Sequence, residues 1–328
     1  MKILVIRFSS IGDIALTFPV VRCIKEQVTD SEVHYLTKPN FETLLTACKF
    51  TDKTHFLAKD LKETVRLLKQ EQFDVVIDLH NNLRTHLLTF QLGVKCYRFP
   101  KLNFQKWLLT QFKINRLPEK HVVDRYFEAV AQIGVKNDSK NNQFYIPSTE
   151  TVNCTTTYDL APKSYLAVAI GAQFATKRIP EPKLLEILSQ VSLPIVLLGG
   201  KEDFAQAESI CQKLSNQSVH NACGKHSLLA SASLVSQAKI LLTNDTGLMH
   251  IAACFAVPIV SVWGNTVPAL GMYAYKPEKE VKISQFEVPN LSCRPCSKIG
   301  FQACPKKHFD CMLKQDAGKI VEEIESTN

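Results

Sequence analysis

The strongest constraint on the fold lies between residues 240 and 263, where two apolar runs flank a polar turn and a short helical stretch. Ile240 to Leu242 predicts a strand, Leu248 to Phe255 a helix, and Pro258 to Trp263 a second strand. Together they predict one βαβ unit, whose two parallel strands belong to an open α/β sheet.

The turn of this unit presents a carboxylate, a hydroxyl and backbone N–H groups where the helix begins. Unpaired N–H groups and the helix dipole favour an anion there, beyond the carboxyl ends of the strands. Asp245, Thr246 and Gly247 are therefore candidate ligands for a phosphorylated molecule, and His250 lies one helical turn further on. The alternative is that Asp245 only caps the helix and Gly247 only allows tight packing.

Length and the repeated layout predict two domains, because 328 residues exceed one ordinary core. Strands and helices alternate in both halves, which predicts parallel sheets covered by helices on both faces. Between residues 134 and 163 this pattern dissolves into polar residues and proline. We therefore expect domains at residues 1–150 and 151–328, the second with a cysteine-rich segment at 291–311.

Composition narrows the class of protein. The chain is 45% hydrophobic and 21% charged, as in soluble globular proteins, and no stretch approaches the roughly 20 apolar residues of a membrane span. The apolar run at the N-terminus stops at Arg7, so it predicts a strand and not a signal peptide, and we expect a cytoplasmic protein. The net charge of +8 indicates an anionic partner. Because the basic residues are dispersed, a phosphorylated substrate or membrane surface is favoured over nucleic acid.

Two further strand ends in the second half carry charged residues. Lys177 follows the strand Tyr165 to Ile170 and is expected at the same sheet edge as Asp245, where it suits a departing diphosphate. Glu202 and Asp203 follow the next strand, where a carboxylate can bind a ribose diol or cap the following helix. The alternative for Lys177 is an exposed loop lysine.

The first strand of the chain ends in Gly12 and Asp13, which the sharp turn presents at the carboxyl edge of its sheet. A carboxylate there can remove a proton from an acceptor hydroxyl, or it can cap a helix. Arg84 and Arg98 lie near other strand ends and can bind a phosphorylated or carboxylated acceptor, although an exposed arginine explains either one.

The chain has neither a dinucleotide glycine motif nor a P-loop, which argues against dehydrogenases and P-loop NTPases.

The eleven cysteines form two groups. Seven are scattered through apolar segments and are expected to pack as small hydrophobic side chains. The other four cluster near His308, and four thiolates at such spacing can bind a structural Zn²⁺. These four are Cys293, Cys296, Cys304 and Cys311. The alternative is that these cysteines pack as reduced thiols or form an adventitious disulfide.

Gly12-Asp13, Lys177 to Pro180 and Asp245 to His250 resemble, in order and spacing, the motifs of the bacterial heptosyltransferases, glycosyltransferase family nine. His121 to Tyr126 is similar to the family's segment before the domain linker. The resemblance spans nearly the whole chain. It implies a GT-B fold of two Rossmann-like, doubly wound domains facing each other across a cleft, the acceptor bound by the first and the nucleotide sugar by the second.

The resemblance also implies roles for individual residues. Asp13 matches the general base, Lys177 the donor-phosphate lysine and Glu202 the ribose-binding carboxylate. The residues that match the donor-binding turn are Asp245, Thr246, Gly247 and His250. The implied donor is ADP-heptose, the acceptor is a lipid-linked core sugar of lipopolysaccharide, and inverting transfer needs no metal. Gln173 to Thr176 departs from the paired threonines of better-known members, so contacts to the sugar or base differ there.

Two other functions remain open. A sugar-nucleotide epimerase or hydrolase on the same scaffold would keep the donor turn but needs further acid and base residues. A non-catalytic nucleotide-sugar-binding homologue is the second alternative, and the presence of Asp13 argues against it. Peripheral contact with the inner membrane fits the positive charge and an anionic glycolipid acceptor, although the sequence shows no evident amphipathic anchor.

Overall fold

A computed structural model describes residues 1–327 and divides the chain into two compact units. Unit 1 comprises Met1–Leu102, Lys120–Tyr145 and Tyr275–Glu278. Unit 2 comprises Asn103–Glu119, Ile146–Ala274 and the chain from Lys279 onward. The main division thus falls between residues 145 and 146, whereas the sequence placed it after residue 150. Residues 103–119 belong to unit 2 and residues 275–278 to unit 1, although the chain on either side of each segment belongs to the other unit. No change in amino-acid composition marks these two segments.

The sheet of unit 1 has five parallel strands in the order β3-β2-β1-β4-β5. Its strands are β1 (Lys2–Ile6), β2 (Glu32–Thr37), β3 (Lys53–Phe56), β4 (Val75–Asp78) and β5 (Cys96–Arg98). The predicted parallel sheet is confirmed. Strand order reverses between β1 and β4, and ligands of doubly wound sheets bind at this switch point, outside the carboxyl ends of the strands.

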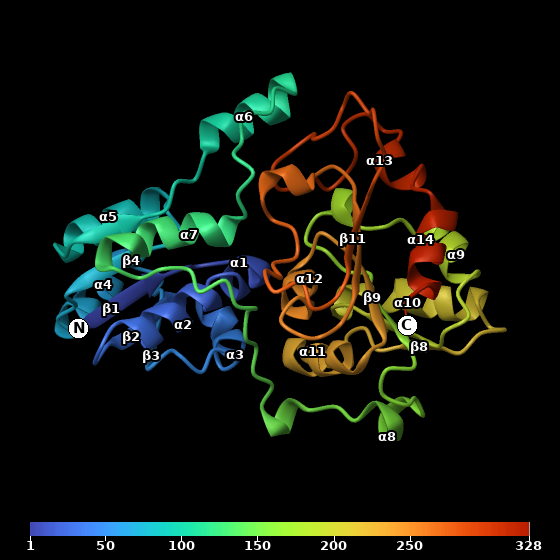
Figure 1. The fold of residues 1–328 in the computed structure, drawn as a ribbon, viewed down its shortest axis with the longest axis horizontal. Helices are drawn as coiled ribbons and strands as arrows, with labels where there is room; N and C mark the ends of the chain where they lie inside the picture. Colours follow the sequence, from blue (N-terminus) through green and yellow to red (C-terminus); the bar gives the residue numbers. More distant parts are fainter. Residues whose placement is uncertain (328) are drawn as a thin grey trace. The chain divides into compact units, whose positions relative to one another are not determined.

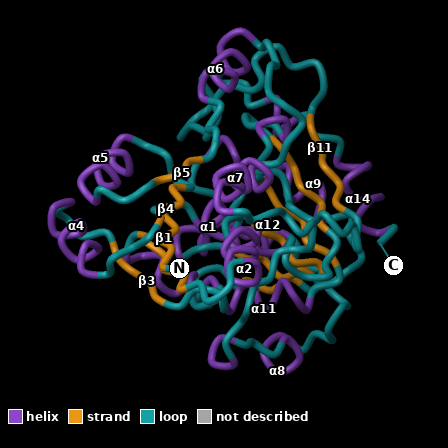
Figure 2. The backbone as a smooth tube through the Cα atoms, turned by 60° about the vertical axis from the view of Figure 1, so that its left-hand side comes forward, coloured by secondary structure: helices purple, strands orange, loops and turns teal. Residues whose placement is uncertain are grey.

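Helices cover both faces of this sheet, with α4 and α5 on one side and α2 and α7 on the other (Figure 2). The helices of unit 1 are α1 (Ile11–Ala15), α2 (Phe18–Gln27), α3 (Glu42–Leu45), α4 (Leu61–Gln70), α5 (Leu83–Leu92) and α7 (Val122–Val130). Residues 11–27 form two helices, and Pro19 occupies the first turn of the second, α2. Leu4 and Leu36 on the sheet pack with Val65 of α4 and Leu88 of α5 in one apolar core.

The sheet of unit 2 has six parallel strands in the order β11-β10-β9-β6-β7-β8. Its strands are β6 (Leu166–Ala169), β7 (Ile195–Leu198), β8 (Val219–Asn221), β9 (Ile240–Asn244), β10 (Ile259–Trp263) and β11 (Ile283–Glu287). Strand order reverses between β6 and β9, the switch point of this unit. The predicted βαβ unit is confirmed as β9, α12 (Gly247–Ala252) and β10.

Figure 1 shows α9, α10 and α14 on one side of this second sheet and α11 and α12 on the other. The remaining helices of unit 2 are α6 (Asn103–Phe112), α8 (Cys154–Tyr158), α9 (Glu181–Leu188), α10 (Phe204–Lys213), α11 (Leu228–Gln237), α13 (Asp310–Leu313) and α14 (Ala317–Glu325). Asp316 caps the last helix, α14, since its side chain accepts a hydrogen bond from the Lys319 N–H. No helix within residues 1–327 combines the length and apolar character needed to cross a bilayer.

Candidate active site

The switch point of unit 2 brings together the lysine and the aspartate that the sequence placed at one sheet edge. Lys177 Nζ lies 2.7 Å from Asp245 Oδ2, and both side chains are largely buried. Thr266 Oγ1 donates a second hydrogen bond to the same carboxylate oxygen, at 2.8 Å. The residue at the N-cap of α12 is Thr246, so the alternative that Asp245 caps this helix is wrong.

The loop that carries Lys177 is fixed from two sides. The loop ends in a short 3-10 helix, η4 (Ala175–Lys177), which follows β6. Asn244, the last residue of β9, donates from Nδ2 to the Lys177 carbonyl at 3.0 Å. Thr176 exchanges hydrogen bonds with the backbone of Phe301 in the cysteine-rich segment. Lys177 is therefore a positioned side chain and not a freely exposed loop lysine.

The two carboxylates after β7 have different surroundings. Asp203 is buried, pairs with Arg178 Nη1 at 2.7 Å and accepts a hydrogen bond from the Gly200 N–H. Glu202 is exposed beside it on the short 3-10 helix η5 (Lys201–Asp203). Asp203 therefore holds the two strand-end loops together, and Glu202 is the carboxylate left accessible to a ligand.

The other residues predicted for the donor turn lie on α12. Thr246 and Gly247 begin this helix and are half-buried, and the Thr246 hydroxyl makes no capping bond. His250 is buried on the same helix, one turn further on. The predicted residues of the donor turn are thus confined to one strand-to-helix connection, next to Lys177.

At the switch point of unit 1, Asp13 is tied to the end of β1. Its Oδ1 lies 2.5 Å from Arg7 Nη2, and its Oδ2 accepts hydrogen bonds from the Ser10 N–H and hydroxyl. Arg7 is anchored in turn by the carbonyls of Ser9 and Leu79. Asp13 therefore supports the start of α1 from the third helical position and also forms an ion pair, which the sequence did not indicate.

This environment controls the charge of the groups around Asp13. Burial alone would raise the pKa of Asp13, but the Arg7 charge and the Ser10 hydrogen bonds hold this pKa below its ordinary value. His80 follows β4 and packs against Phe8. Burial, together with the charges of Arg7, Lys101 and Lys38, lowers the pKa of His80 to about 3. The site thus combines an ionised carboxylate with a neutral imidazole at neutral pH.

The two arginines predicted for the acceptor differ in their freedom. Arg84 is exposed on the first turn of α5. Arg98 is bound inward: its Nε lies 3.2 Å from Oδ2 of the buried Asp78, and its Nη2 donates to Thr89 Oγ1. Two charged neighbours of this site, Lys38 and Lys101, were not identified from the sequence. Each lysine follows the end of a strand, and this position is the one signal that could have identified it.

The four clustered cysteines are free thiols in the segment that contacts the loop carrying Lys177. Cys293 Sγ lies 4.0 Å from His308 Nε2, and Cys296 Sγ lies 3.1 Å from the Cys293 carbonyl oxygen. Burial, with smaller contributions from neighbouring thiols, raises the pKa of Cys296 to about 11. Burial also raises the pKa of Cys311, to about 12. Both thiols are therefore expected to carry their protons at neutral pH.

The two units, each a doubly wound parallel sheet covered by helices, have the GT-B fold of solved heptosyltransferase structures. The sequence profile of glycosyltransferase family 9 (heptosyltransferase) matches residues 62–300. The chain belongs to this family.

Individual relatives agree with this assignment. The chain is 27% identical to lipooligosaccharide heptosyltransferase 2 of Haemophilus ducreyi over 296 residues, which cover 82% of this chain and 85% of the relative. A family 9 glycosyltransferase structure from Veillonella parvula is similar with a TM-score of 0.77 at 20% identity, over 99% of this chain and 96% of that one. The E. coli heptosyltransferase WaaC with ADP is similar with a TM-score of 0.69 at 18% identity, over 100% of both chains.

Proposed function

We propose that the chain is an inverting glycosyltransferase that moves heptose from ADP-heptose to a lipopolysaccharide core or a similar anionic glycolipid. The observation that carries the proposal is the contact between Lys177 and Asp245 at the switch point of unit 2. The proposed donor is supported by similar structures described with ADP and with ADP-2-deoxy-2-fluoro heptose. The proposed acceptor is supported by relatives named lipopolysaccharide and lipooligosaccharide heptosyltransferases.

In this proposal unit 2 binds the donor. The Lys177 ammonium stabilises the negative charge that grows on the diphosphate as it leaves, and Asp245 keeps this ammonium oriented. Thr246 and the turn around it bind the phosphate oxygens, and His250 supports this turn from the next turn of α12. The exposed Glu202 binds the ribose hydroxyls. Since Lys177 supplies the positive charge, this step needs no metal ion.

Asp13 of unit 1 then acts as the general base. The acceptor hydroxyl oxygen bonds to the anomeric carbon while the bond from that carbon to the diphosphate oxygen breaks, and attack from the opposite side inverts the centre. The hydroxyl proton passes to the Asp13 carboxylate, and the electron pair of the broken bond stays with the diphosphate. The hydroxyl becomes strongly acidic as its new bond forms, so a carboxylate of low pKa can accept this proton.

The acceptor is expected to be anionic near its reacting sugar. The charges of Lys38, Lys101 and Asp13 all act on His80, and Arg84 is exposed on the first turn of α5. Lysine and arginine side chains bind carboxylates and phosphates through charge-assisted hydrogen bonds. Arg98 contributes less in this proposal, because Asp78 and Thr89 already occupy its guanidinium.

Asp13→Ala tests the assignment of the base. Transfer of heptose to a lipopolysaccharide acceptor is expected to be lost, whereas binding of ADP-heptose by calorimetry stays within a factor of about two, because Asp13 belongs to the other unit. Lys177→Ala and Asp245→Ala are expected to weaken donor binding and turnover together. Transfer that survives in Asp13→Ala would exclude Asp13 as the base.

The same assay separates the alternative functions. Consumption of ADP-heptose without acceptor, at the rate of the complete reaction, would identify a hydrolase or an epimerase. Tight donor binding with no turnover, for every glycolipid offered, would identify a binding protein.

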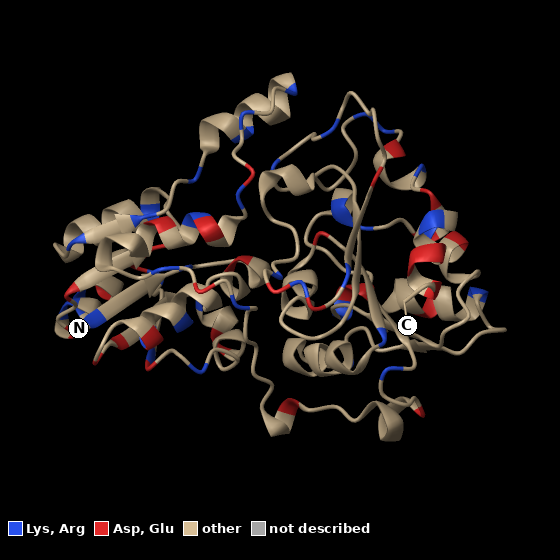
Figure 3. Cartoon of the chain, in the orientation of Figure 1, with Lys and Arg blue, Asp and Glu red and all other residues tan. Residues whose placement is uncertain are grey.

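We also propose that the chain reaches its acceptor at the cytoplasmic face of the inner membrane through α6. Phe104, Trp107 and Phe112 of this helix are 66%, 48% and 58% exposed. The Trp107 ring packs against both phenylalanine rings. Lys106 lies among them, Lys113 and Arg116 follow, and Figure 3 shows no acidic residue on the helix. Aromatic side chains beside basic ones are typical of segments that bind anionic lipid surfaces.

Sedimentation with phosphatidylglycerol vesicles tests this surface. Trp107→Ser is expected to reduce binding at least several-fold, and neutral phosphatidylcholine vesicles should bind less protein than anionic ones. Tyr145→Ser removes a similarly exposed aromatic ring of unit 1 and serves as the control. Equal binding by Trp107→Ser and the original chain would exclude α6 as the contact.

A structural Zn²⁺ at Cys293, Cys296, Cys304 and Cys311 remains a proposal. Zn–S bonds of about 2.3 Å require the sulfur atoms to approach within about 3.8 Å of one another, so the segment must close around the ion. Metal analysis of protein purified without chelators tests it. Less than half an equivalent of zinc would exclude the site.

A further inference from the structure

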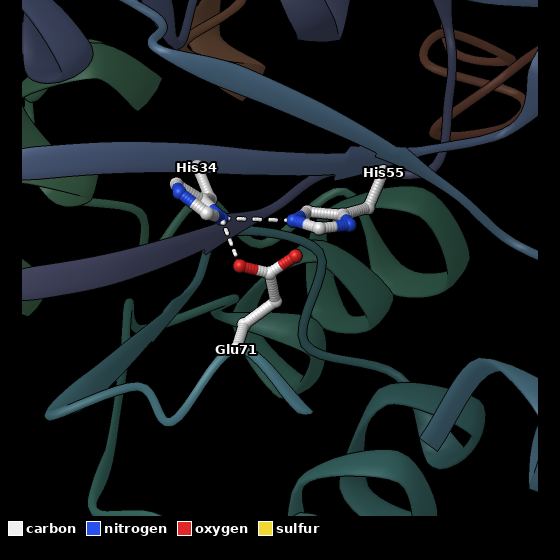
Figure 4. Close-up of side chains that lie close together, drawn as sticks. All are labelled: His34, His55 and Glu71. Atoms are coloured by element: carbon white, nitrogen blue, oxygen red, sulfur yellow. Dashed lines mark hydrogen bonds and ion pairs between the residues drawn. The ribbon is translucent and has the colours of Figure 1, made fainter. Parts of the chain in front are cut away.

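His34, His55 and Glu71 form a cluster of ligand-type side chains in unit 1, separate from the residues discussed above. Among residues 1–327, these are the three such side chains whose ligand atoms all lie within 4.8 Å of one another. His34 Nδ1 lies 2.8 Å from His55 Nε2 and 3.9 Å from Glu71 Oε2. Figure 4 shows the carboxylate of Glu71 directed at the facing nitrogens of the two rings.

The parallel register of β2 and β3 creates this arrangement. His34 pairs with Lys53, and His55 lies two residues further along β3, so both rings stand on the same face of the sheet. Glu71 ends α4 above this face as its C-cap residue. The ring of Phe73 packs edge-on against both imidazoles and closes the cluster on one side.

The protonation of His34 follows from its partners. Its Nε2 lies 2.7 Å from Glu32 Oε1, and an ionised carboxylate can only accept, so Nε2 carries the proton. In the tautomer of His34 that is protonated at Nε2 alone, Nδ1 presents a lone pair toward His55 Nε2. If the His55 proton moves to its own Nδ1, the two facing nitrogens both present lone pairs.

We propose that His34 Nδ1, His55 Nε2 and the Glu71 carboxylate bind one divalent transition-metal ion, for which Zn²⁺ is the best fit. Two imidazoles and one carboxylate form a common three-ligand set for zinc, which takes water as its fourth ligand. Glu32 on the far nitrogen of His34 supplies the carboxylate–histidine–metal relay that orients such ligands.

Small shifts bring the ligands to bonding distance. Zn–N bonds of about 2.0–2.1 Å in tetrahedral geometry separate two nitrogens by about 3.3 Å. The rings therefore move apart by roughly half an ångström, and Glu71 moves toward them by a similar amount. His55 and Glu71 are only half-buried and can make this adjustment, whereas the fully buried His34 stays fixed.

Two lysines compete with the metal for Glu71. Lys53 Nζ lies 2.5 Å from Oε1 and Lys2 Nζ lies 3.4 Å from Oε2 of this carboxylate. The side chain of Lys53 is 54% exposed, so it can turn into solvent when a dication arrives. Removing the Lys53 charge is therefore expected to increase the affinity for the metal, so the proposal can be tested by a variant that binds more tightly.

The proposed ion would join the edge strand β3 to β2 and to the end of α4. His34 lies in the middle of β2 and His55 lies on the edge strand β3, whereas Asp13 follows the carboxyl end of β1. The metal therefore stabilises unit 1 and takes no part in transfer.

Titration of the chelator-treated full-length protein with Co²⁺ tests the site. Binding in a ratio of one to one is expected, with the visible d–d absorption of a four-coordinate site and without the sulfur-to-cobalt charge-transfer band of thiolate ligands. Cys304→Ser is the background for all measurements, and the sulfur-to-cobalt band reports any Co²⁺ that the remaining cysteines bind. His55→Ala should abolish this binding, and Glu32→Gln should weaken it about tenfold or more.

Lys53→Met removes the competing lysine and tests for tighter metal binding. His86→Ala removes an exposed histidine of unit 1 and serves as the control. Lys53→Met is expected to bind Co²⁺ more tightly, and His86→Ala to bind it unchanged. Circular dichroism and the melting temperature establish that each variant is folded. Absence of binding in the Cys304→Ser protein, or unchanged affinity in folded His55→Ala, would overturn the proposal.

Discussion

Asp13 carries two tasks at the residue scale, because it stabilises the fold and is proposed to accept a proton. Its folded-state pKa lies below the ordinary value of 3.8. The interactions with Arg7 and Ser10 therefore stabilise the protein above that value, and this contribution is lost as the pH falls through the lowered pKa. The same interactions weaken Asp13 as a base but keep it ionised down to acidic pH.

Arg7→Met tests how far Arg7 lowers the pKa of Asp13, because this pKa determines the pH dependence of transfer. Without the guanidinium, the pKa of Asp13 rises, because its burial is no longer opposed by a facing positive charge. The acidic limb of kcat/KM is expected to move to higher pH by about one unit. The pH–rate profile of the variant measures this shift.

Arg7→Lys is the control, since it keeps a positive charge at the end of β1 and should retain most of the original profile. A profile of Arg7→Met that coincides with the original would show that the ion pair does not tune Asp13.

The neighbouring carboxylates after β7 allow a paired comparison. Arg178→Met leaves Asp203 buried without its cation, which is expected to cost about 3 kcal/mol of the free energy of unfolding. Glu202→Gln changes an exposed group and should alter stability by less than about 0.5 kcal/mol while weakening donor binding. Urea unfolding and donor calorimetry measure the two quantities. Equal destabilisation by both variants would contradict the separate roles of Asp203 and Glu202.

At the scale of elements, the cysteine-rich segment acts as a support for the loop that carries Lys177. Gly300 has a φ of +119°, and a Cβ added there would lie 2.6 Å from Cβ of Phe174. Its neighbour Phe301 exchanges hydrogen bonds with Thr176. The two segments are therefore expected to move together.

Gly300→Ala is expected to cost about 1–3 kcal/mol through backbone strain and to weaken donor binding by displacing this loop. Thermal unfolding and donor calorimetry measure both effects. Gly318→Ala is the matched control, since its added Cβ meets nothing closer than 3.5 Å and the residue is helical. It should leave the donor affinity unchanged and stabilise α14 slightly. Undiminished donor binding by Gly300→Ala would show that the support is dispensable.

The long elements were predictable because apolar periodicity identifies them, and the predicted strands Tyr165 to Ile170 and Pro258 to Trp263 lie within one residue of β6 and β10. The strands that the sequence reading missed are short: β5, β8 and β11. They lie at the edges of their sheets, where residues such as Cys96, His220 and Gln285 contribute little apolar signal. The parallel order of the sheets followed from the alternation of elements.

The candidate site was predictable only in part. The sequence placed Lys177 and Asp245 at one edge, since parallel strands end together, and the two side chains are in contact. Their partner Thr266 lies beyond the next strand and has no recognisable motif. The pairing of Arg7 with Asp13 depends on the direction of two side chains around a turn, which residue spacing does not determine.

At the scale of the whole molecule, each unit has its own apolar core and its own switch point. ADP is therefore expected to protect unit 2 from hydrogen exchange at the ends of β6, β7 and β9, and to leave β1–β4 unchanged. Hydrogen exchange measured by mass spectrometry, with and without ADP, tests this. Protection confined to unit 1 would contradict the assignment of the donor to unit 2.

The chain enters unit 1 a last time at Tyr275–Glu278, and this return determines how chimeric transferases can be built. Tyr275 packs its ring on His121, and its hydroxyl lies 3.0 Å from Asn137 Nδ2. Glu278 accepts a hydrogen bond from the Asn141 N–H. A second half exchanged between homologues at a single junction near residue 146 would bring a foreign version of residues 275–278 into the recipient's first half. Recombination that alters sugar specificity therefore needs a second pair of junctions, around 275 and 278, so that each half keeps its own partners.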